Sequence, residues 1–225
     1  MAKPALLANY PDLGERVYEA VREQIVTCEL APGSPLPVVD LARQLGVSLT
    51  PVRDALNRLA AEGLVEDVAR KGYFVARLDP EDIVDLLNAR RLIELAAVEE
   101  GIGRIQPDQL GELKRLSDEM RQLFDDDGNC VDYAGFSRRD SQFHQLVVGT
   151  AGNEHLVHIY RSLSVHVHIY RTNLAAQGGY HRSLASAHEH EAILVAFESR
   201  DLPALKAALN VHVRGVVEAF GGDPQ

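Results

Sequence analysis

Residues 41–65 read Leu-Ala-Arg-Gln-Leu-Gly-Val-Ser-Leu-Thr-Pro-Val-Arg-Asp-Ala-Leu-Asn-Arg-Leu-Ala-Ala-Glu-Gly-Leu-Val, and this stretch decides the fold of the N-terminal part of the chain. Gly46 falls where a turn between two short helices needs a residue that tolerates positive φ. Ser48 can cap the second helix, with Thr50 as an alternative cap, and Pro51 suits its first turn. The pattern predicts a helix, a tight turn, a second helix and a strand.

The second helix, expected over about residues 50–62, is amphipathic. Its apolar stripe consists of Val52, Leu56 and Leu59, and its outward face carries Leu49, Arg53 and Asn57. An outward polar face on the second helix of such a pair is the geometry of a recognition helix, which reads base edges in the DNA major groove.

Three further elements complete this segment. Apolar residues with helical spacing predict a helix over 12–28, and a turn-rich break at residues 31–37 precedes the helix expected over 38–45. Residues 65–78 read as two short strands with Arg70 and Lys71 at the tip between them. A basic tip on a two-stranded hairpin is typical of a winged helix-turn-helix, whose wing contacts the adjacent backbone or minor groove.

Composition narrows the class of protein. The chain has 225 residues with 46% hydrophobic content, enough for one large or two small domains with a real core. No window approaches about 18 consecutive apolar residues, so neither a membrane span nor a membrane partner is expected, and the N-terminus lacks the apolar run of a signal peptide. Two lone cysteines, Cys28 and Cys130, suit a reducing compartment, so we expect a cytoplasmic protein.

The net charge of −10 is unevenly distributed. Residues 1–78 carry a net charge of −1, the remainder carries −9, and residues 43–77 hold six basic residues against four acidic ones. Because salt screens exposed charges beyond about 8 Å, the local face matters more than the total. The acidic remainder is expected to lower non-specific affinity for DNA and so favour specific sites.

The sequence turns almost wholly helical after Asp79-Pro80. Helices are expected at about 81–100, 107–126, 130–149, 153–176, 182–199 and 202–219. We therefore predict a mainly α protein, with a winged helix-turn-helix DNA-binding domain over residues 1–78 and an all-α bundle over 79–225.

Several polar residues of this second domain fall on apolar stripes. Asp140 and His144 share a helix face, and His190 and His212 lie on the core-facing stripes of two other helices. A buried carboxylate needs a partner or a metal, and one carboxylate with three imidazoles suits a divalent ion. Hydrogen-bonded core histidines and a simple Asp140–His144 pair remain the alternative.

Arg90 also lies on an apolar stripe. Its guanidinium could grip a ligand carboxylate through two parallel hydrogen bonds. Glu94, one turn further on, could equally well be its partner.

The chain resembles the GntR superfamily of bacterial transcription regulators, in its FadR-type branch with an FCD effector domain. The resemblance covers about residues 12–218 and rests on Gly46-Val-Ser-Leu-Thr-Pro-Val-Arg53, Glu62-Gly-Leu64, Gly72-Tyr-Phe-Val75, Arg90-Arg-Leu-Ile-Glu94, Asp140-Ser-Gln-Phe-His144, Glu189-His-Glu-Ala-Ile-Leu194 and His212. It implies a homodimeric regulator, most simply a repressor, whose recognition helices enter major grooves about 34 Å apart on a double-stranded operator.

The resemblance also implies roles for individual residues. The family's metal ligands map onto Asp140, His144, His190 and His212, with zinc or nickel as the favoured ion, and a small organic acid is the expected effector at the metal and Arg90. The expected DNA contacts are Arg53 to a base edge or phosphate, Ser48 and Thr50 to phosphate, Arg70 and Lys71 to backbone or minor groove, and Arg58, which could face away.

Position 49 departs from the family pattern, because the usual Arg is Leu49 here. An Arg–guanine contact discriminates by about 1–3 kcal/mol, and an apolar contact to a thymine methyl could replace it.

Two other functions remain open: a metal sensor in which the ion is the signal, and a metal-dependent hydrolase or lyase. The sequence has no His-Glu-x-x-His motif, because Ala192 stands where the second histidine would follow His188-Glu189. The prediction is therefore a regulator rather than an enzyme.

Overall fold

The computed structural model describes residues 13–176 and 183–220. The chain divides into two compact units, whose boundary in the sequence lies between Arg77 and Leu78. The N-terminus, in which no signal peptide is expected, lies outside the described residues. Within the described residues, no helix is both long and apolar enough to cross a membrane.

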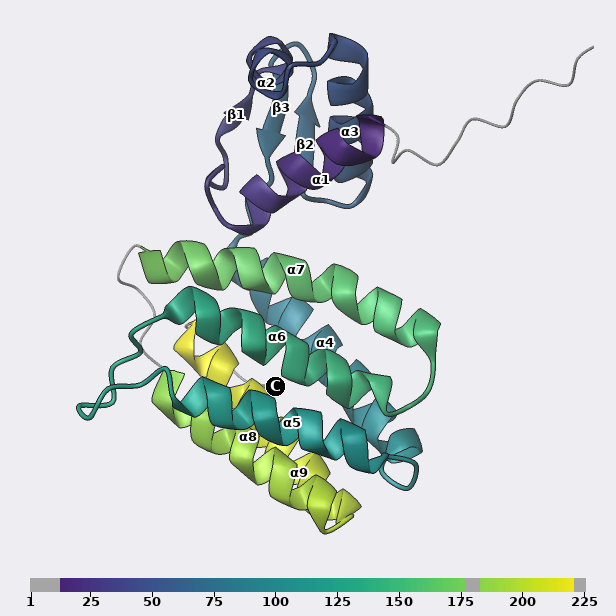
Figure 1. Ribbon diagram of the computed structural model, residues 1–225, viewed down its shortest axis with the longest axis vertical. Coiled ribbons are helices and arrows are strands. Elements are labelled where there is room, and N and C mark those ends of the chain that lie inside the picture. Colours follow the sequence, from purple (N-terminus) through teal and green to yellow (C-terminus); the bar gives the residue numbers. More distant parts are fainter. Residues whose placement is uncertain (1–12, 177–182, 221–225) are drawn as a thin grey trace, which may run out of the picture. The chain divides into compact units, whose positions relative to one another are not determined.

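Over residues 13–77, the first unit combines three helices with a small antiparallel sheet (Figure 1). Its elements are α1 (Leu13–Val26), β1 (Pro35–Leu36), α2 (Val38–Leu45), α3 (Leu49–Ala61), β2 (Val65–Val68) and β3 (Gly72–Val75). The strand order is β1-β3-β2, with Leu36 opposite Tyr73 and Val65 opposite Val75. This is the predicted winged helix-turn-helix, except that β1 forms within residues 31–37, where the sequence predicts only a turn-rich break.

Local sequence explains these elements. Gly46 ends α2 in the left-handed conformation, with φ 67°, so the predicted turn is confirmed. Ser48 stands at the N-cap of α3, but its side chain makes no capping hydrogen bond. Val52, Leu56 and Leu59 are fully buried, so α3 packs its apolar stripe inward and leaves its other face exposed.

The second unit is a bundle of six helices within the described residues (Figure 1). They are α4 (Pro80–Gly101), α5 (Pro107–Arg121), α6 (Tyr133–Gly149), α7 (Glu154–Ala176), α8 (Ser183–Glu198) and α9 (Leu202–Ala219). The predicted fold class is therefore confirmed, with helix ends within a few residues of expectation.

Caps and core packing hold the bundle. The Asp82 carboxylate accepts from the backbone N–H of Asp79 at 3.2 Å, and the Asp201 carboxylate accepts from Ala204 at 3.0 Å. α6 packs against α4, α5 and α7, while α9 packs against α4 and α8. This arrangement turns one face of α6 toward faces of α8 and α9 across the core, where Phe143 and Phe197 are completely buried.

Candidate metal centre and nucleic-acid interface

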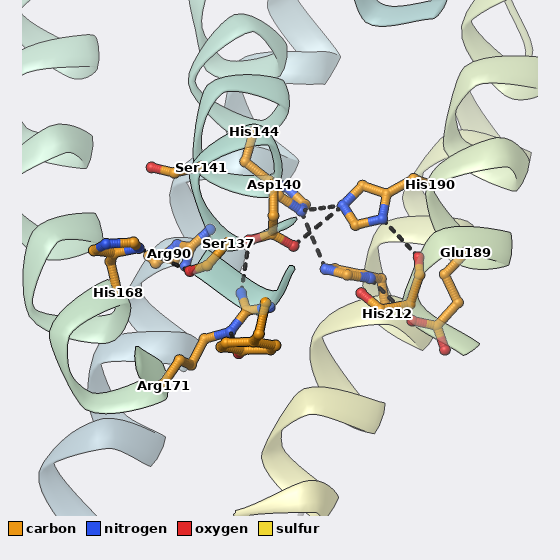
Figure 2. A network of polar contacts seen from close by, with 12 residues as sticks. Arg90, Ser137, Asp140, Ser141, His144, His168, Arg171, Glu189, His190 and His212 are labelled. Carbon is orange, nitrogen blue, oxygen red and sulfur yellow. Dashed lines mark hydrogen bonds and ion pairs between the residues drawn. The ribbon is translucent and has the colours of Figure 1, made fainter. Parts of the chain in front are cut away.

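Four side chains from three helices converge on one point in the bundle: Asp140 and His144 of α6, His190 of α8 and His212 of α9 (Figure 2). All four are buried, and one ligand-type atom of each lies within 4.8 Å of those of the others. The structure therefore brings together the four residues that the sequence predicts as metal ligands.

Each histidine ring turns its Nδ1 atom toward an oxygen acceptor. The Nδ1 atoms of His144, His190 and His212 lie 3.0 Å from Glu94 Oε2, 2.6 Å from the Ser186 carbonyl oxygen and 2.9 Å from Glu189 Oε2, respectively. A carboxylate or carbonyl oxygen only accepts, so each Nδ1 carries the proton. Each Nε2 atom of the neutral rings is consequently left with a lone pair.

These lone pairs face one another. The Nε2 atom of His144 lies 3.1 Å from that of His212 and 3.2 Å from that of His190. Oδ1 of Asp140 lies 3.3 Å from His190 Nε2 and has no hydrogen-bond partner among the described residues. Four electron-pair donors this close repel one another unless a cation or a shared proton lies among them, and imidazole with carboxylate is a donor set that suits transition metals.

Burial and charge set the protonation of these groups. Burial lowers the pKa of His190 and His212, which favours the neutral, ligating form of both rings. Burial alone would raise the pKa of Asp140, but the Arg171 guanidinium and then the neighbouring histidines outweigh this effect and hold that pKa well below its ordinary value. The site therefore combines an ionised carboxylate with two imidazoles, His190 and His212, whose neutral form is favoured, as metal binding requires.

Arg171 is a part of this site that the sequence analysis missed. Its Nη1 atom donates to Asp140 Oδ2 at 2.6 Å, and its Nε atom donates to the hydroxyl of Tyr133 at 3.0 Å. Its spacing in the sequence does indicate an inward-facing side chain, because Arg171 continues the buried row of α7 that includes Tyr160, Ser164 and Val167. Arg90 was identified from the same kind of spacing.

Arg90 points into the same region and has partners of its own. Its Nε and Nη2 atoms lie 3.0 and 2.6 Å from the Tyr160 hydroxyl, and Nη2 lies 3.7 Å from Glu94 Oε1. The contact between Arg90 and Glu94 that the sequence offers as an alternative is thus present in the structure, and Tyr160 shares the same guanidinium.

A small cavity adjoins the cluster. Its volume is about 10 Å³, and it is lined by Leu87, Arg90, Glu94, Asp140, His144, Arg171, His212, Val213 and Val216. A volume of this size accommodates about one water molecule. An organic acid could enter only if the lining side chains moved.

The exposed face of α3 carries the residues predicted to contact DNA. Ser48, Leu49, Thr50 and Arg53 are all exposed at its N-terminal end, and Leu49 is 40% exposed. Arg53 makes no side-chain hydrogen bond or ion pair with the other described residues. A helix N-terminus with its free N–H groups and positive dipole end suits phosphate contacts.

Arg58 is placed differently. Its Nη1 atom lies 2.6 Å from Glu15 Oε2, its Nε atom lies 3.5 Å from Glu62 Oε1, and its guanidinium stacks 3.7 Å above the centre of the Tyr18 ring. These contacts tie α3 to α1. They weaken the expectation that Arg58 contacts DNA.

The tip of the β2–β3 hairpin is basic and exposed. Arg70 adopts a positive φ of 65°, and the Lys71 backbone N–H closes the turn onto the Val68 carbonyl oxygen at 2.9 Å. Both side chains are exposed, as a wing that contacts a phosphate backbone requires.

A winged helix with an exposed recognition face, followed by a separate helical domain, is the architecture of a class of DNA-binding transcription regulators. The model of the "Bacterial regulatory proteins, gntR family" matches residues 13–75, and the FCD domain model matches residues 85–215. The chain belongs to the GntR family, carries an FCD domain and is a DNA-binding transcription regulator, not an enzyme.

Individual relatives of this chain are also named as transcriptional regulators. The chain is 31% identical over 213 residues to an "Uncharacterized HTH-type transcriptional regulator in unstable DNA locus" of Streptomyces ambofaciens, covering 90% of this chain and 82% of the relative. It is 28% identical to the "Probable D-xylose utilization operon transcriptional repressor" of Paenarthrobacter nicotinovorans, covering 92% and 88%. The solved structure of E. coli McbR/YncC shares the fold at 20% identity, with a TM-score of 0.79 and coverage of 94% and 98%.

Proposed function

We propose that this protein is a homodimeric repressor whose affinity for its operator is set by a small organic acid bound at a metal site. Residues 1–78 would bind double-stranded DNA, and residues 79–225 would hold a divalent transition metal, zinc or nickel, and the effector. The resemblance between this chain and a relative named as a repressor supports the direction of regulation.

The arrangement of the three imidazole rings is the observation that carries the proposal. All three Nδ1 atoms are held by oxygen acceptors, so all three Nε2 lone pairs are presented to one point beside Asp140. Partners of this kind orient metal-binding histidines and make them more basic. When bound, the ion would supply a Lewis acid that attracts a carboxylate oxygen.

The charge of the site favours an anionic effector. The Asp140 carboxylate pairs with the Arg171 guanidinium and the Glu94 carboxylate lies opposite Arg90, so these two pairs of opposite charges balance. A divalent ion would add positive charge to the site. A carboxylate effector would offset part of that charge, and an unneutralised buried charge is costly.

DNA binding is assigned to α3 and the wing. Arg53 would contact a base edge or phosphate, Ser48 and Thr50 would contact phosphate, and Leu49 would contact a thymine methyl. Arg70 and Lys71 would contact backbone or minor groove. Two copies on a near-palindromic operator would place their recognition helices in successive major grooves.

The test combines metal content with DNA binding. Protein purified without chelators should contain stoichiometric zinc or nickel by elemental analysis, and the His190→Ala/His212→Ala variant should contain none. A His155→Ala/His158→Ala variant is the matched control, because both of these histidines are exposed on α7. Normal metal content in the first variant would refute the site.

The second arm of this test measures operator affinity by fluorescence anisotropy while small carboxylic acids are titrated into the metal-loaded protein. We expect at least one acid to change the affinity 5- to 150-fold, the range of about 1–3 kcal/mol of coupling. If none of the tested acids changes the operator affinity, the proposal that an organic acid is the effector is refuted.

The cavity size supports one alternative, a metal-sensing regulator. A volume of about 10 Å³ leaves no room for an organic acid beside the ligands unless side chains move. If the ion is the signal, operator affinity will follow the free metal concentration and no acid will alter it.

A further inference from the structure

Glu94 lies in the middle of α4 and is 1% exposed. Its two carboxylate oxygens have different partners. Oε2 accepts the Nδ1 proton of His144 at 3.0 Å, whereas Oε1 accepts a short hydrogen bond from the Tyr160 hydroxyl and faces Arg90. One buried carboxylate thus joins α4, α6 and α7 directly beside the proposed metal ligands.

We propose that Glu94 is a positioning residue of the metal site, which holds His144 in its ligating orientation and couples occupancy of the site to α4. The inference rests on the proposed function, since it needs a metal to be bound. It assigns a role to a residue that is not itself a ligand.

The first step concerns His144. A charged acceptor at Nδ1 fixes the tautomer in which Nε2 bears the lone pair, and it also makes the ring a better donor. The acceptor at His190 is a neutral carbonyl of Ser186, and the acceptor at His212 is Glu189, whose side chain is 17% exposed. Of the two carboxylates that accept from Nδ1 atoms, Glu94 is therefore the more deeply buried, and solvent screens its charge less.

The second step concerns α4. None of the four proposed ligands comes from this helix; α4 packs against α6 and α9, and the Glu94–His144 hydrogen bond is the direct polar contact that the described residues show between α4 and a proposed ligand. The helix begins at Pro80, directly after the DNA-binding unit in the sequence. Arg90, also on α4, donates a hydrogen bond to the same Tyr160 hydroxyl that donates to Glu94. A change at His144 would therefore reach α4 through Glu94.

The test replaces the carboxylate by its neutral isostere, Glu94→Gln. Zinc affinity is measured by competition with a chromophoric chelator, and we expect a loss of about 10- to 100-fold, the usual effect of removing such a partner. Glu99→Gln is the matched control on the same helix, because Glu99 is exposed and pairs with Lys206 at 2.7 Å. Its zinc affinity should equal that of the wild type.

The melting temperature of the metal-free proteins separates positioning from simple stability. If Glu94→Gln lowers that temperature but binds zinc as tightly as Glu99→Gln does, the proposal is overturned. Tyr160→Phe leaves the carboxylate and its contact with His144 in place, so it should lose less zinc affinity than Glu94→Gln; an equal or larger loss would overturn the assignment to Glu94. A wild-type protein that binds neither zinc nor nickel would instead refute the proposed function.

Hydrogen exchange of the wild type tests the coupling without any substitution. Zinc should increase the protection of residues 87–98 of α4 more than that of α5, which supplies neither a ligand nor a partner to one. Equal protection of the two helices would overturn the link between the site and α4.

Discussion

Removal of the metal should destabilise the helical unit selectively. Without an ion, the Nε2 atom of His144 lies 3.1 Å from that of His212 and 3.2 Å from that of His190. The rings must then turn away from their Nδ1 partners or share a proton, and burial disfavours protonation of His190 and His212. Each response weakens the packing among α6, α8 and α9.

The size of the effect follows from linkage. A ligand present at 100 times its dissociation constant stabilises the folded state by about 2.7 kcal/mol when the unfolded chain does not bind it. For a unit of about 150 residues, each kcal/mol shifts the melting temperature by about 2–4 °C. Zinc at that concentration should therefore raise the melting temperature of the helical unit by about 5–11 °C.

Calorimetry of the full chain, stripped with a chelator and then titrated with zinc, measures this shift. The transition of the winged-helix unit should stay in place, because the proposed ligands all lie in the other unit. His212→Ala should abolish the shift, and His155→Ala should retain it. A shift that persists in His212→Ala, or one that affects both units equally, would refute the reasoning.

Three other perturbations test the remaining assignments. Arg53→Ala should weaken operator binding by about 1–3 kcal/mol, the value of a good side-chain–base contact; an unchanged gel-shift affinity would remove Arg53 from the interface. Lys71→Ala should reduce the slope of log affinity against log salt concentration by about 1, which is the signature of one lost phosphate contact, and an unaltered slope would count against the wing. Phe143→Ala should lower the free energy of unfolding by about 3–5 kcal/mol in urea titrations, because this α6 ring is fully buried and packs edge-on against the His190 ring. A loss under 1 kcal/mol would show that the core repacks there.

The elements of the DNA-binding unit could be predicted because their signals are local. Gly46 has the positive φ that its turn demands, and the stripe of α3 is buried as its spacing indicates. β1 was missed because two residues, Pro35 and Leu36, carry no periodicity. Their pairing with β3 depends on a partner nearly 40 residues away, and proline is tolerated there because the strand lies at the sheet edge.

The inward orientation of Asp140, His144, His190 and His212 could also be predicted, since each lies on an apolar stripe of its own helix, and the family resemblance singled out these four as a set. The partners behind the rings could not, because they lie 23 to 50 residues away for His212 and His144. Periodicity tells which side chains point inward, but it does not tell which of them meet. Arg171 shows the same limit: its pairing with Asp140 needs the packing of α6 against α7.

The partners of Arg90 suggest how an effector could act on the helix that follows the DNA-binding unit. In the structure its guanidinium is held by Tyr160, which also holds Glu94. A carboxylate that binds the Nε and Nη2 atoms of Arg90 through charge-assisted hydrogen bonds would displace the Tyr160 hydroxyl from them, and the cavity of about 10 Å³ admits an acid only if the lining side chains move. An acid bound in this way would weaken the contact between Arg90 and Glu94. An effector and a metal would then meet at one residue of α4, which gives the two ligands a common route to that helix.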